Sequence, residues 1–306
     1  MQSTEQTQRY TRHSLVKKYV EGETKEQRKH RKSLEKQAKA MAKQAKALEE
    51  LVEIEKAQKS VEIVRNMPQE NVEKNYILCL KHGTKYSPDY VNKLYNMCKR
   101  HCTIDFEFVC LTEDPTKLDP NIKTIPLPTN LSGWWCKPYM FSKDLPLNGT
   151  ILYMDLDVVV SSNIDKLFTY HPNNWCTIRD FTRAMRPKWQ KYNSSIVRFR
   201  VGQLDHVWTE YQRDMVAIQK RLHGDQDWLY EATRNSQAML YPDSWILSWK
   251  WEVRKNKEYA HGGTRGNRKL KHVENAKPRV ECCVCVFHGD PSPHNCEDPW
   301  VVENWQ

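Results

Sequence analysis

The sequence lacks any long apolar run. Its 306 residues contain no stretch of about eighteen consecutive apolar residues, which is the length that a membrane-spanning helix requires. Residues 1–5 also lack the apolar core of a secretory signal peptide. We therefore expect a soluble protein of the cytoplasm, or of the host cytoplasm if the source is a virus, with no membrane partner.

The cysteine spacing is unlike that of standard zinc ribbons or fingers. Ten cysteines are present, with Cys98 and Cys102 one helical turn apart and Cys282, Cys283 and Cys285 crowded together. In a cytoplasmic protein we predict that they are buried free thiols rather than disulfides. A zinc site drawing on Cys98, Cys102, Cys282 and Cys285 remains an open alternative.

Helix-breaking residues are missing from the region after Gly22. Residues 23–65 contain no proline or glycine and are rich in Lys, Glu, Gln and Ala, which predicts a long helix. Apolar side chains recur there with heptad spacing, at Leu34, Ala38, Met41, Ala45, Leu48 and Val52. Because two of the six are alanines, self-association through residues 34–52, packing on the body and binding along a partner all remain open. We assign residues 1–67 to a helical arm and 68–306 to a globular domain.

Positive charge is concentrated in two segments. The formal net charge is +10; residues 1–66 carry 16 Lys/Arg against 10 Asp/Glu, and residues 246–280 carry 10 against 3. The remainder is slightly acidic. This distribution predicts a polyanionic partner, with a basic surface that has no specific partner as the alternative.

The globular part reads as an α/β domain. At 39% hydrophobic residues, the chain can bury one α/β core plus an appendage. A strand at 76–80, a helix at 88–100 and a strand at 106–111 form a β-α-β unit, which requires a parallel sheet. We also expect a short strand at 122–125, then a helix at 134–141 that leads into a further strand at 151–160.

Two aspartates stand out in that last strand. Asp155 and Asp157 interrupt an apolar, β-branched run, and residues i and i+2 of an extended chain point the same way. The two can therefore converge on one cation or phosphate. Without a partner they would repel each other and raise one pKa, so we predict a divalent metal or a shared proton. Ligands of open α/β sheets bind at the carboxyl ends of strands, where these acids lie. The alternative is a strand end whose acids simply face water.

Two enzyme classes use an apolar strand that ends in Asp-x-Asp. In haloacid-dehalogenase-type phosphatases the first Asp is a nucleophile, and Gly224-Asp225-Gln226-Asp227 could imitate the later metal-binding acids. That family's aspartate strand normally opens the domain, whereas here a complete β-α-β unit precedes it.

The second class is better matched, because five motifs occur in the order of the family-8 glycosyltransferases, which include glycogenin and bacterial galactosyltransferases. They are residues 76–86, Trp134-Trp135-Cys136-Lys137 before the Asp-x-Asp strand, Asn193-Ser194-Ser195, Asp225-Gln226-Asp227, and His288-Gly289. The resemblance covers most of residues 74–294. It implies a GT-A fold, a Rossmann-like, mixed, mainly parallel sheet flanked by helices, here with the N-terminal helical arm added.

The resemblance also implies the chemistry. A UDP-sugar donates its sugar to a hydroxyl group with retention of configuration, and a divalent cation neutralises the diphosphate as it leaves. Asp155, Asp157 and His288 correspond to the metal ligands, and carboxylate plus imidazole suits Mn²⁺ better than Mg²⁺. Without a metal, His288 reads as a core or loop histidine.

The remaining site residues follow from the same motifs. The donor-binding set is Lys81, Tyr86, Trp135, Lys137 and Asp155, and the set near the transferred sugar is Asp225, Gln226 and Asn193. Tyr86 would stack on the uracil or pack in the core, and Asp225 could instead be a helix N-cap. Ser292 stands where the family has a lysine that meets the diphosphate. Lys137, Lys81 or His294 would have to replace it.

The acceptor is predicted from the second basic segment. It mixes Trp and Gly with Lys250, Arg254, Lys257, Arg265, Arg268 and Lys271. Such a segment beside the cleft favours a phosphate backbone, so we predict transfer to a hydroxymethylated pyrimidine in DNA, as some bacteriophages do. The alternatives are a glycan, lipid or protein acceptor, or a non-catalytic nucleic-acid-binding scaffold.

Overall fold

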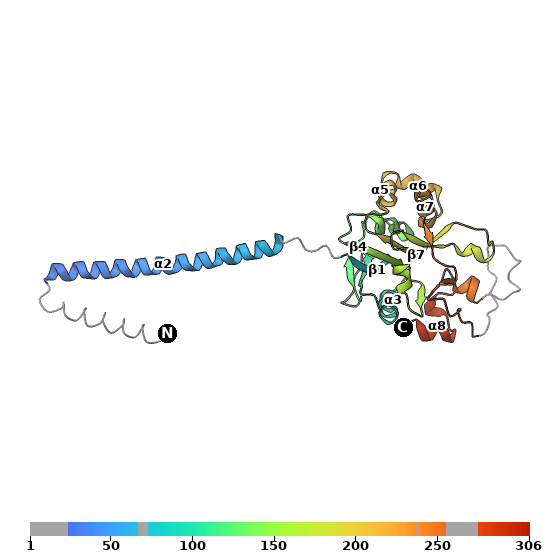
Figure 1. Cartoon of the computed structure of the whole chain (residues 1–306), viewed down its shortest axis with the longest axis horizontal. Coiled ribbons are helices and arrows are strands. Elements are labelled where there is room, and N and C mark those ends of the chain that lie inside the picture. The colour runs from blue at the N-terminus through green and yellow to red at the C-terminus, as the bar shows by residue number, and fades with distance from the viewer. Residues whose placement is uncertain (1–23, 67–72, 237, 255–274) are drawn as a thin grey trace. The chain divides into compact units, whose positions relative to one another are not determined.

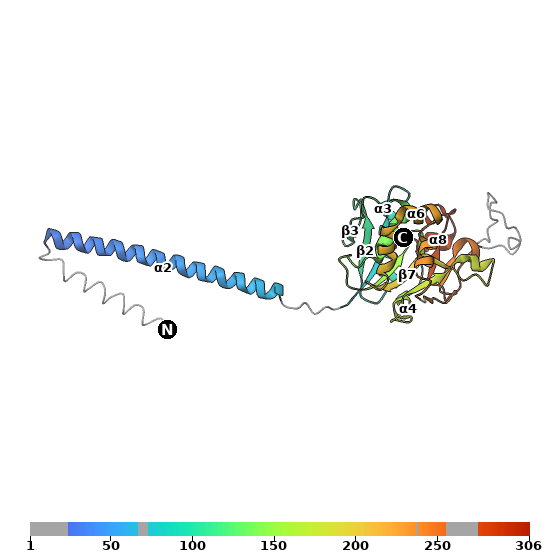
Figure 2. The same cartoon turned by 90° about the horizontal axis from the view of Figure 1, so that it is seen from above.

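The computed structural model describes residues 24–66, 73–236, 238–254 and 275–306. The chain forms two compact units, residues 1–70 and residues 71–306 (Figures 1 and 2). Within the described ranges, no helix is both long enough and apolar enough to cross a membrane.

The first unit contains one long helix, α2, at Lys25–Asn66. It begins with a reciprocal cap, in which the Gln27 amide N–H donates to Thr24 Oγ1 and the Thr24 N–H donates to Gln27 Oε1. Leu34 and Met41 are exposed to 51% and 70%. The long helix predicted from composition is therefore present, and the described part of its heptad seam faces solvent. The side chains of Leu48 and Val52 lie outside the described residues.

The second unit is built on a seven-stranded sheet in the order β3-β2-β1-β4-β7-β6-β8. The strands are β1 Lys74–Lys81, β2 Glu107–Thr112, β3 Lys123–Ile125, β4 Gly149–Met154, β6 Cys176–Arg179, β7 Tyr192–Arg200 and β8 Met239–Leu240. Strands β3, β2, β1 and β4 are parallel, β7 is antiparallel to β4 and β6, and β8 is parallel to β6. The sheet is mixed and mainly parallel, as predicted.

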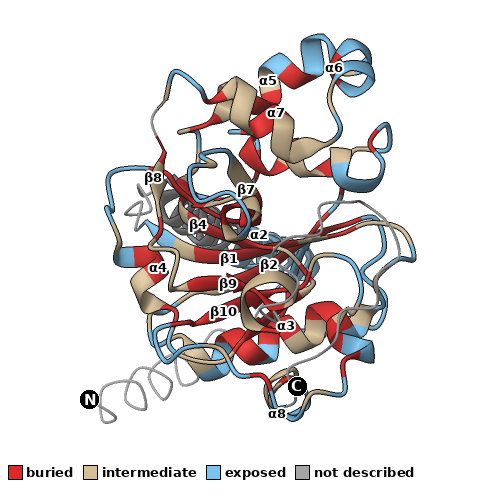
Figure 3. Cartoon of the chain, turned by 90° about the vertical axis from the view of Figure 1, so that its right-hand side faces the viewer, coloured by how far each residue is buried: buried red, intermediate tan, exposed pale blue. Residues whose placement is uncertain are grey.

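Helices cover both faces of this sheet (Figure 3). One face packs against α3, at Pro88–His101, while the other packs against the 3₁₀ helix η1 at Gly133–Phe141, α5 at Asp205–Arg213 and α7 at Asp225–Ala232. Alternate residues of β1 divide between the two cores, Ile77 facing α3 and Leu78 facing η1. The other short helices are α4 Asp165–Thr169, η2 Phe181–Ala184, α6 Met215–Arg221, η3 Trp249–Val253, η5 Pro293–Asn295 and α8 Pro299–Asn304.

The predicted strand over 151–160 is in fact two strands. β4 ends at Met154, a bend follows, and β5 begins at Val158 and ends at Val160. β5 belongs to a second, three-stranded sheet with β10 (Val284–Val286) and β9 (Ile246–Ser248). A continuous apolar pattern does not reveal such a change of partner. The aspartates therefore lie at the junction of two sheets rather than within one strand.

A glycine opens β4. Gly149 has φ +123°, and a Cβ built there would lie 2.2 Å from the carbonyl oxygen of Lys74 on β1. Only glycine fits this close approach of two backbones. The residue therefore fixes the start of the strand that delivers Asp155.

Candidate active site

The site is built around the two aspartates that follow β4. The backbone N–H of Asp155 donates to the carbonyl of Ser195 on β7 at 2.9 Å. Its carboxylate accepts a hydrogen bond from the Tyr153 hydroxyl at 2.7 Å. Asp157 accepts one from the Tyr86 hydroxyl at 2.8 Å. Each carboxylate is thus oriented by a tyrosine.

The two carboxylates repel each other. Burial, and after it the charge of Asp155, raises the pKa of Asp157 to about 6. The Tyr86 hydrogen bond and the nearby charges of Lys85 and Lys137 oppose that rise in the pKa. The pair therefore carries more negative charge than its own protein partners neutralise.

Lys137 joins the first aspartate to a third carboxylate. Its Nζ lies 2.9 Å from Asp155 Oδ1 and 3.2 Å from Asp225 Oδ2, and it donates to Ser194 Oγ at 3.2 Å. Although burial lowers the pKa of Lys137, the two carboxylates raise it above its usual value. The ammonium stays charged, and it connects η1, β4, β7 and α7 at one point.

Asp225 does not cap its helix. The N-cap of α7 is Gly224, and the Asp225 carboxylate instead accepts the Ser194 hydroxyl at 2.7 Å. The N-cap alternative for Asp225 is therefore wrong. The side chain faces the site because the helix begins one residue earlier.

A series of hydrogen-bonded side chains lies beside this ion pair. Asn193 Nδ2 donates to Gln226 Oε1, and Gln226 Nε2 donates to Asp180 Oδ2, both at 2.9 Å. Asn193 Oδ1 also accepts the Ser195 N–H at 2.9 Å. Asp180 was absent from the sequence prediction. No sequence motif marks Asp180 as a site residue, because it lies just after β6 and serves as the N-cap of η2.

His288 is half-buried and lies near Asp180 of this series. Its Nε2 lies 2.6 Å from Ser248 Oγ, its ring stacks on Phe181 at 5.4 Å, and Trp251 meets it edge-on at 4.5 Å. Burial, followed by the charge of Lys250, lowers the pKa of His288 to about 4, and Asp180 opposes that shift. The imidazole is therefore neutral at pH 7. The segment is attached to the aspartates, because the Phe287 N–H donates to the Asp157 carbonyl at 2.8 Å.

Comparison with known proteins identifies the fold. No protein-family model and no curated protein matches the sequence. Among solved structures, the galactosyltransferase LgtC, determined with donor and acceptor sugar analogues, is 13% identical, aligns over 74% of this chain and 93% of its own, and gives a TM-score of 0.50. The bifunctional glycosyltransferase WbbM is 13% identical over 78% of this chain and 50% of its own, with a TM-score of 0.52. The globular unit has the GT-A fold.

This result confirms the predicted fold class. It also removes the haloacid-dehalogenase alternative, because the aspartate strand β4 follows three other strands of the main sheet. The β-α-β unit of β1, α3 and β2 is present as predicted.

The aspartate pair fits a divalent cation, but His288 does not form a three-residue metal site with the two aspartates in the described part of the chain. Asp155 Oδ2 and Asp157 Oδ1 accept no hydrogen bond from the described residues, so both are available as ligands. In those same ranges, no three His, Cys, Asp or Glu side chains are grouped so that they could hold a metal ion. The role of His288 as third ligand thus stays a prediction.

Two other predicted donor-binding residues, Lys81 and Trp135, make contacts within the protein. Lys81 is 5% exposed, and its Nζ donates to the Gly83 carbonyl at 3.3 Å. Trp135 stacks on Tyr211 of α5 at 5.7 Å and packs with the η1 core. The role of Trp135 in donor binding stays a prediction.

The predicted acceptor residues do not form a basic surface in the described part of the chain. Lys257, Arg265, Arg268 and Lys271 lie outside the described residues. Arg254 is 4% exposed, and its Nε lies 3.5 Å from Asp298 Oδ2. A buried guanidinium cannot meet a phosphate backbone, so Arg254 is withdrawn from that set.

All ten cysteines are free, nine of them buried. The thiol prediction is therefore confirmed. The sulfurs of Cys282 and Cys285 lie 3.7 Å apart, and the cysteines contribute no zinc cluster in the described ranges.

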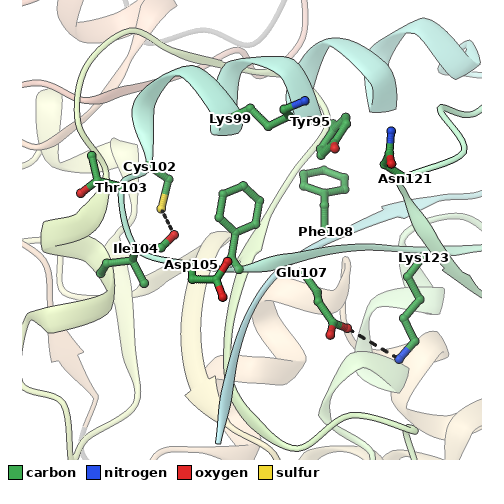
Figure 4. A pocket seen from close by; sticks show the side chains of 11 residues that line it. Tyr95, Lys99, Cys102, Thr103, Ile104, Asp105, Glu107, Phe108, Asn121 and Lys123 are labelled. Atoms are coloured by element: carbon green, nitrogen blue, oxygen red, sulfur yellow. Dashed lines mark hydrogen bonds and ion pairs between the residues drawn. The ribbon is translucent and has the colours of Figure 1, made fainter.

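A separate groove of about 570 Å³ lies near the amino-terminal end of β2 (Figure 4). It is lined by the end of α3 and the start of β2, including Tyr95, Lys99 and Glu107. The aspartates follow the carboxyl end of β4, which is parallel to β1 and hence to β2. The groove is therefore at the opposite end of the strands from the site.

Proposed function

We propose that this protein is a metal-dependent glycosyltransferase that moves a sugar from a nucleoside diphosphate sugar, a UDP-sugar in the first instance, to a hydroxyl acceptor with retention of configuration. The observation that carries the proposal is the junction at Asp155 and Asp157 in a GT-A fold. There Lys137 bridges Asp155 and Asp225, and the Asn193–Gln226 hydrogen bond lies alongside.

The charges at this junction suit a diphosphate leaving group. A divalent cation, Mn²⁺ or Mg²⁺, bound by Asp155 and Asp157 would neutralise the negative charge that develops on the diphosphate. The raised pKa of Asp157 supports such a cation, because the carboxylate lacks a full counter-charge from the protein. Lys137 supplies a fixed ammonium beside Asp155.

The neighbouring polar side chains suit a sugar ring. Lys137 and Ser194 both contact the Asp225 carboxylate and so fix its orientation. Gln226 is fixed between Asn193 and Asp180, so its amide cannot rotate freely. We assign these groups to orienting the donor sugar and to stabilising positive charge at its anomeric carbon during front-face attack.

The acceptor stays a prediction. A hydroxymethylated pyrimidine in DNA rests on a segment of which four of the six named residues lie outside the described ranges, and Arg254 is buried against Asp298. A glycan, lipid or protein hydroxyl remains the alternative.

The test is release of UDP from a panel of UDP-sugars by the purified protein with Mn²⁺, with and without DNA that contains hydroxymethylcytosine. Asp157→Asn should abolish turnover. Asp144→Asn removes the same charge at an exposed position and should leave turnover unchanged. Stimulation by the modified DNA would support the DNA acceptor, whereas turnover that is indifferent to it would direct the search to other hydroxyl acceptors. No turnover and no UDP binding would refute the transferase proposal and favour the scaffold alternative.

A further inference from the structure

The Lys250 ammonium has no carboxylate partner among the residues that the structure describes. Lys250 is half-buried on η3, and its Nζ lies 3.6 Å from the position that a Cβ on Gly289 would occupy. Lys250 therefore lies against the His288–Gly289 segment, although the sequence placed it among acceptor-binding residues.

The backbone that carries Lys250 is firmly held. Trp249 is fully buried and stacks on Phe287 at 5.4 Å and on Trp300 at 5.1 Å. Glu252 accepts the Ser248 N–H at 2.8 Å and pairs with Arg183, whose Nε and Nη2 both lie 3.0 Å from its carboxylate. These contacts fix the backbone of the turn on both sides of the lysine, so the backbone needs no further ordering when the ammonium binds a ligand.

Two of the predicted donor-binding lysines already have partners in the protein. Lys137 has two carboxylates within 3.2 Å, and Lys81 donates to the Gly83 carbonyl. Lys250 makes no ion pair or hydrogen bond with any of the described residues. Because no described carboxylate pairs with the Lys250 ammonium, it is free to pair with an anionic ligand.

The position of Lys250 indicates which anion. The Phe287 N–H bonds to the Asp157 carbonyl, and Gly289 follows two residues later. Gly289 has φ +87° and no side chain, which leaves its backbone open beside the lysine Nζ. The ammonium thus borders the segment whose Phe287 N–H bonds to the Asp157 carbonyl.

We propose that Lys250 binds the diphosphate of the nucleotide donor and stabilises it as the leaving group; this inference rests on the transferase function proposed above. A lysine from η3 thereby fills the role left vacant by Ser292. Each charged hydrogen bond of this kind strengthens binding by about 10- to 100-fold.

The experiment measures nucleotide affinity rather than turnover. Calorimetric titration with UDP, GDP, CDP and ADP in the presence of Mn²⁺ first finds the diphosphate that the wild-type protein binds. Lys250→Met should weaken that binding by about 10- to 100-fold, while Lys250→Arg keeps the charge and should recover most of the affinity. Lys99→Met removes the same charge in the groove of Figure 4 and should bind like wild type.

A parallel titration with the bare nucleoside, followed by ligand-observed NMR, separates a phosphate contact from damage to the base pocket. Equal diphosphate affinity in wild type and Lys250→Met would overturn the inference and leave the transferase proposal intact. A loss that is equally large for the nucleoside would also overturn it. Failure of the wild-type protein to bind any of the four diphosphates would overturn the transferase proposal, and this inference with it.

Discussion

Replacing Asp157 by Asn should stabilise the metal-free protein at neutral pH while destroying its activity. The pKa of Asp157 rises from 3.8 to about 6 on folding, chiefly through burial and the charge of Asp155. The folded state therefore binds this proton more tightly than the unfolded chain. The resulting stability is fully present below about pH 4 and is lost as the pH rises through about 6. Asparagine carries no charge and avoids that loss.

The magnitude follows from the size of the shift. At about 1.4 kcal/mol per pKa unit, a rise from 3.8 to about 6 corresponds to roughly 3 kcal/mol. Because Asp157 is partly exposed, solvent screening reduces the expected gain to about 1–2 kcal/mol at pH 8. The gain should shrink towards zero as the pH falls to about 4.5.

Urea unfolding followed by tryptophan fluorescence measures this gain. All eleven tryptophans lie between residues 134 and 305, so the signal reports only the globular unit. The titrations run from pH 4.5 to 8 with EDTA, using Asp144→Asn as the control for loss of one negative charge. Adding Mn²⁺ should make wild type more stable than Asp157→Asn, because the cation stabilises wild type and not the variant. An Asp157→Asn protein that is no more stable than wild type at pH 8 in EDTA would refute the repulsion argument.

Three further substitutions test the supporting structure. Lys137→Met should lower kcat/KM by about 100-fold, measured by UDP release, because it removes the ammonium that bridges two carboxylates; an effect below about 3-fold would contradict that role. Arg183→Met should cost about 3 kcal/mol in urea unfolding, since it leaves the half-buried Glu252 carboxylate without its guanidinium partner, and adding Glu252→Gln should recover part of the loss; a double variant as unstable as the single one would argue against the pair. Gly149→Ala should cost at least about 2 kcal/mol, because its Cβ would lie 2.2 Å from the Lys74 carbonyl oxygen, and unchanged stability would show that the strands can separate there.

The sequence by itself determined the order of the elements. The apolar run at 76–80, the helix that begins at Pro88 and the run at 106–111 became β1, α3 and β2, because hydrophobic periodicity is a local property that survives folding. The long helix of the arm followed equally from its composition. The Asp-x-Asp pair and the order of the motifs pointed to the site for the same reason, since each motif is contiguous in the chain.

Only the tertiary structure decided which side chains meet. The change of partner between β4 and β5 places the aspartates at a junction of two sheets, which an apolar pattern common to both strands could not reveal. Gln226 donates a hydrogen bond to Asp180, 46 positions earlier in the sequence, and Lys250 lies against Gly289, 39 positions later. Folding brings these distant segments together. Arg254, basic in sequence, turned inward to Asp298. Charge and residue type are fixed by the chain, but the partner of each charge depends on contacts between segments that local patterns do not encode.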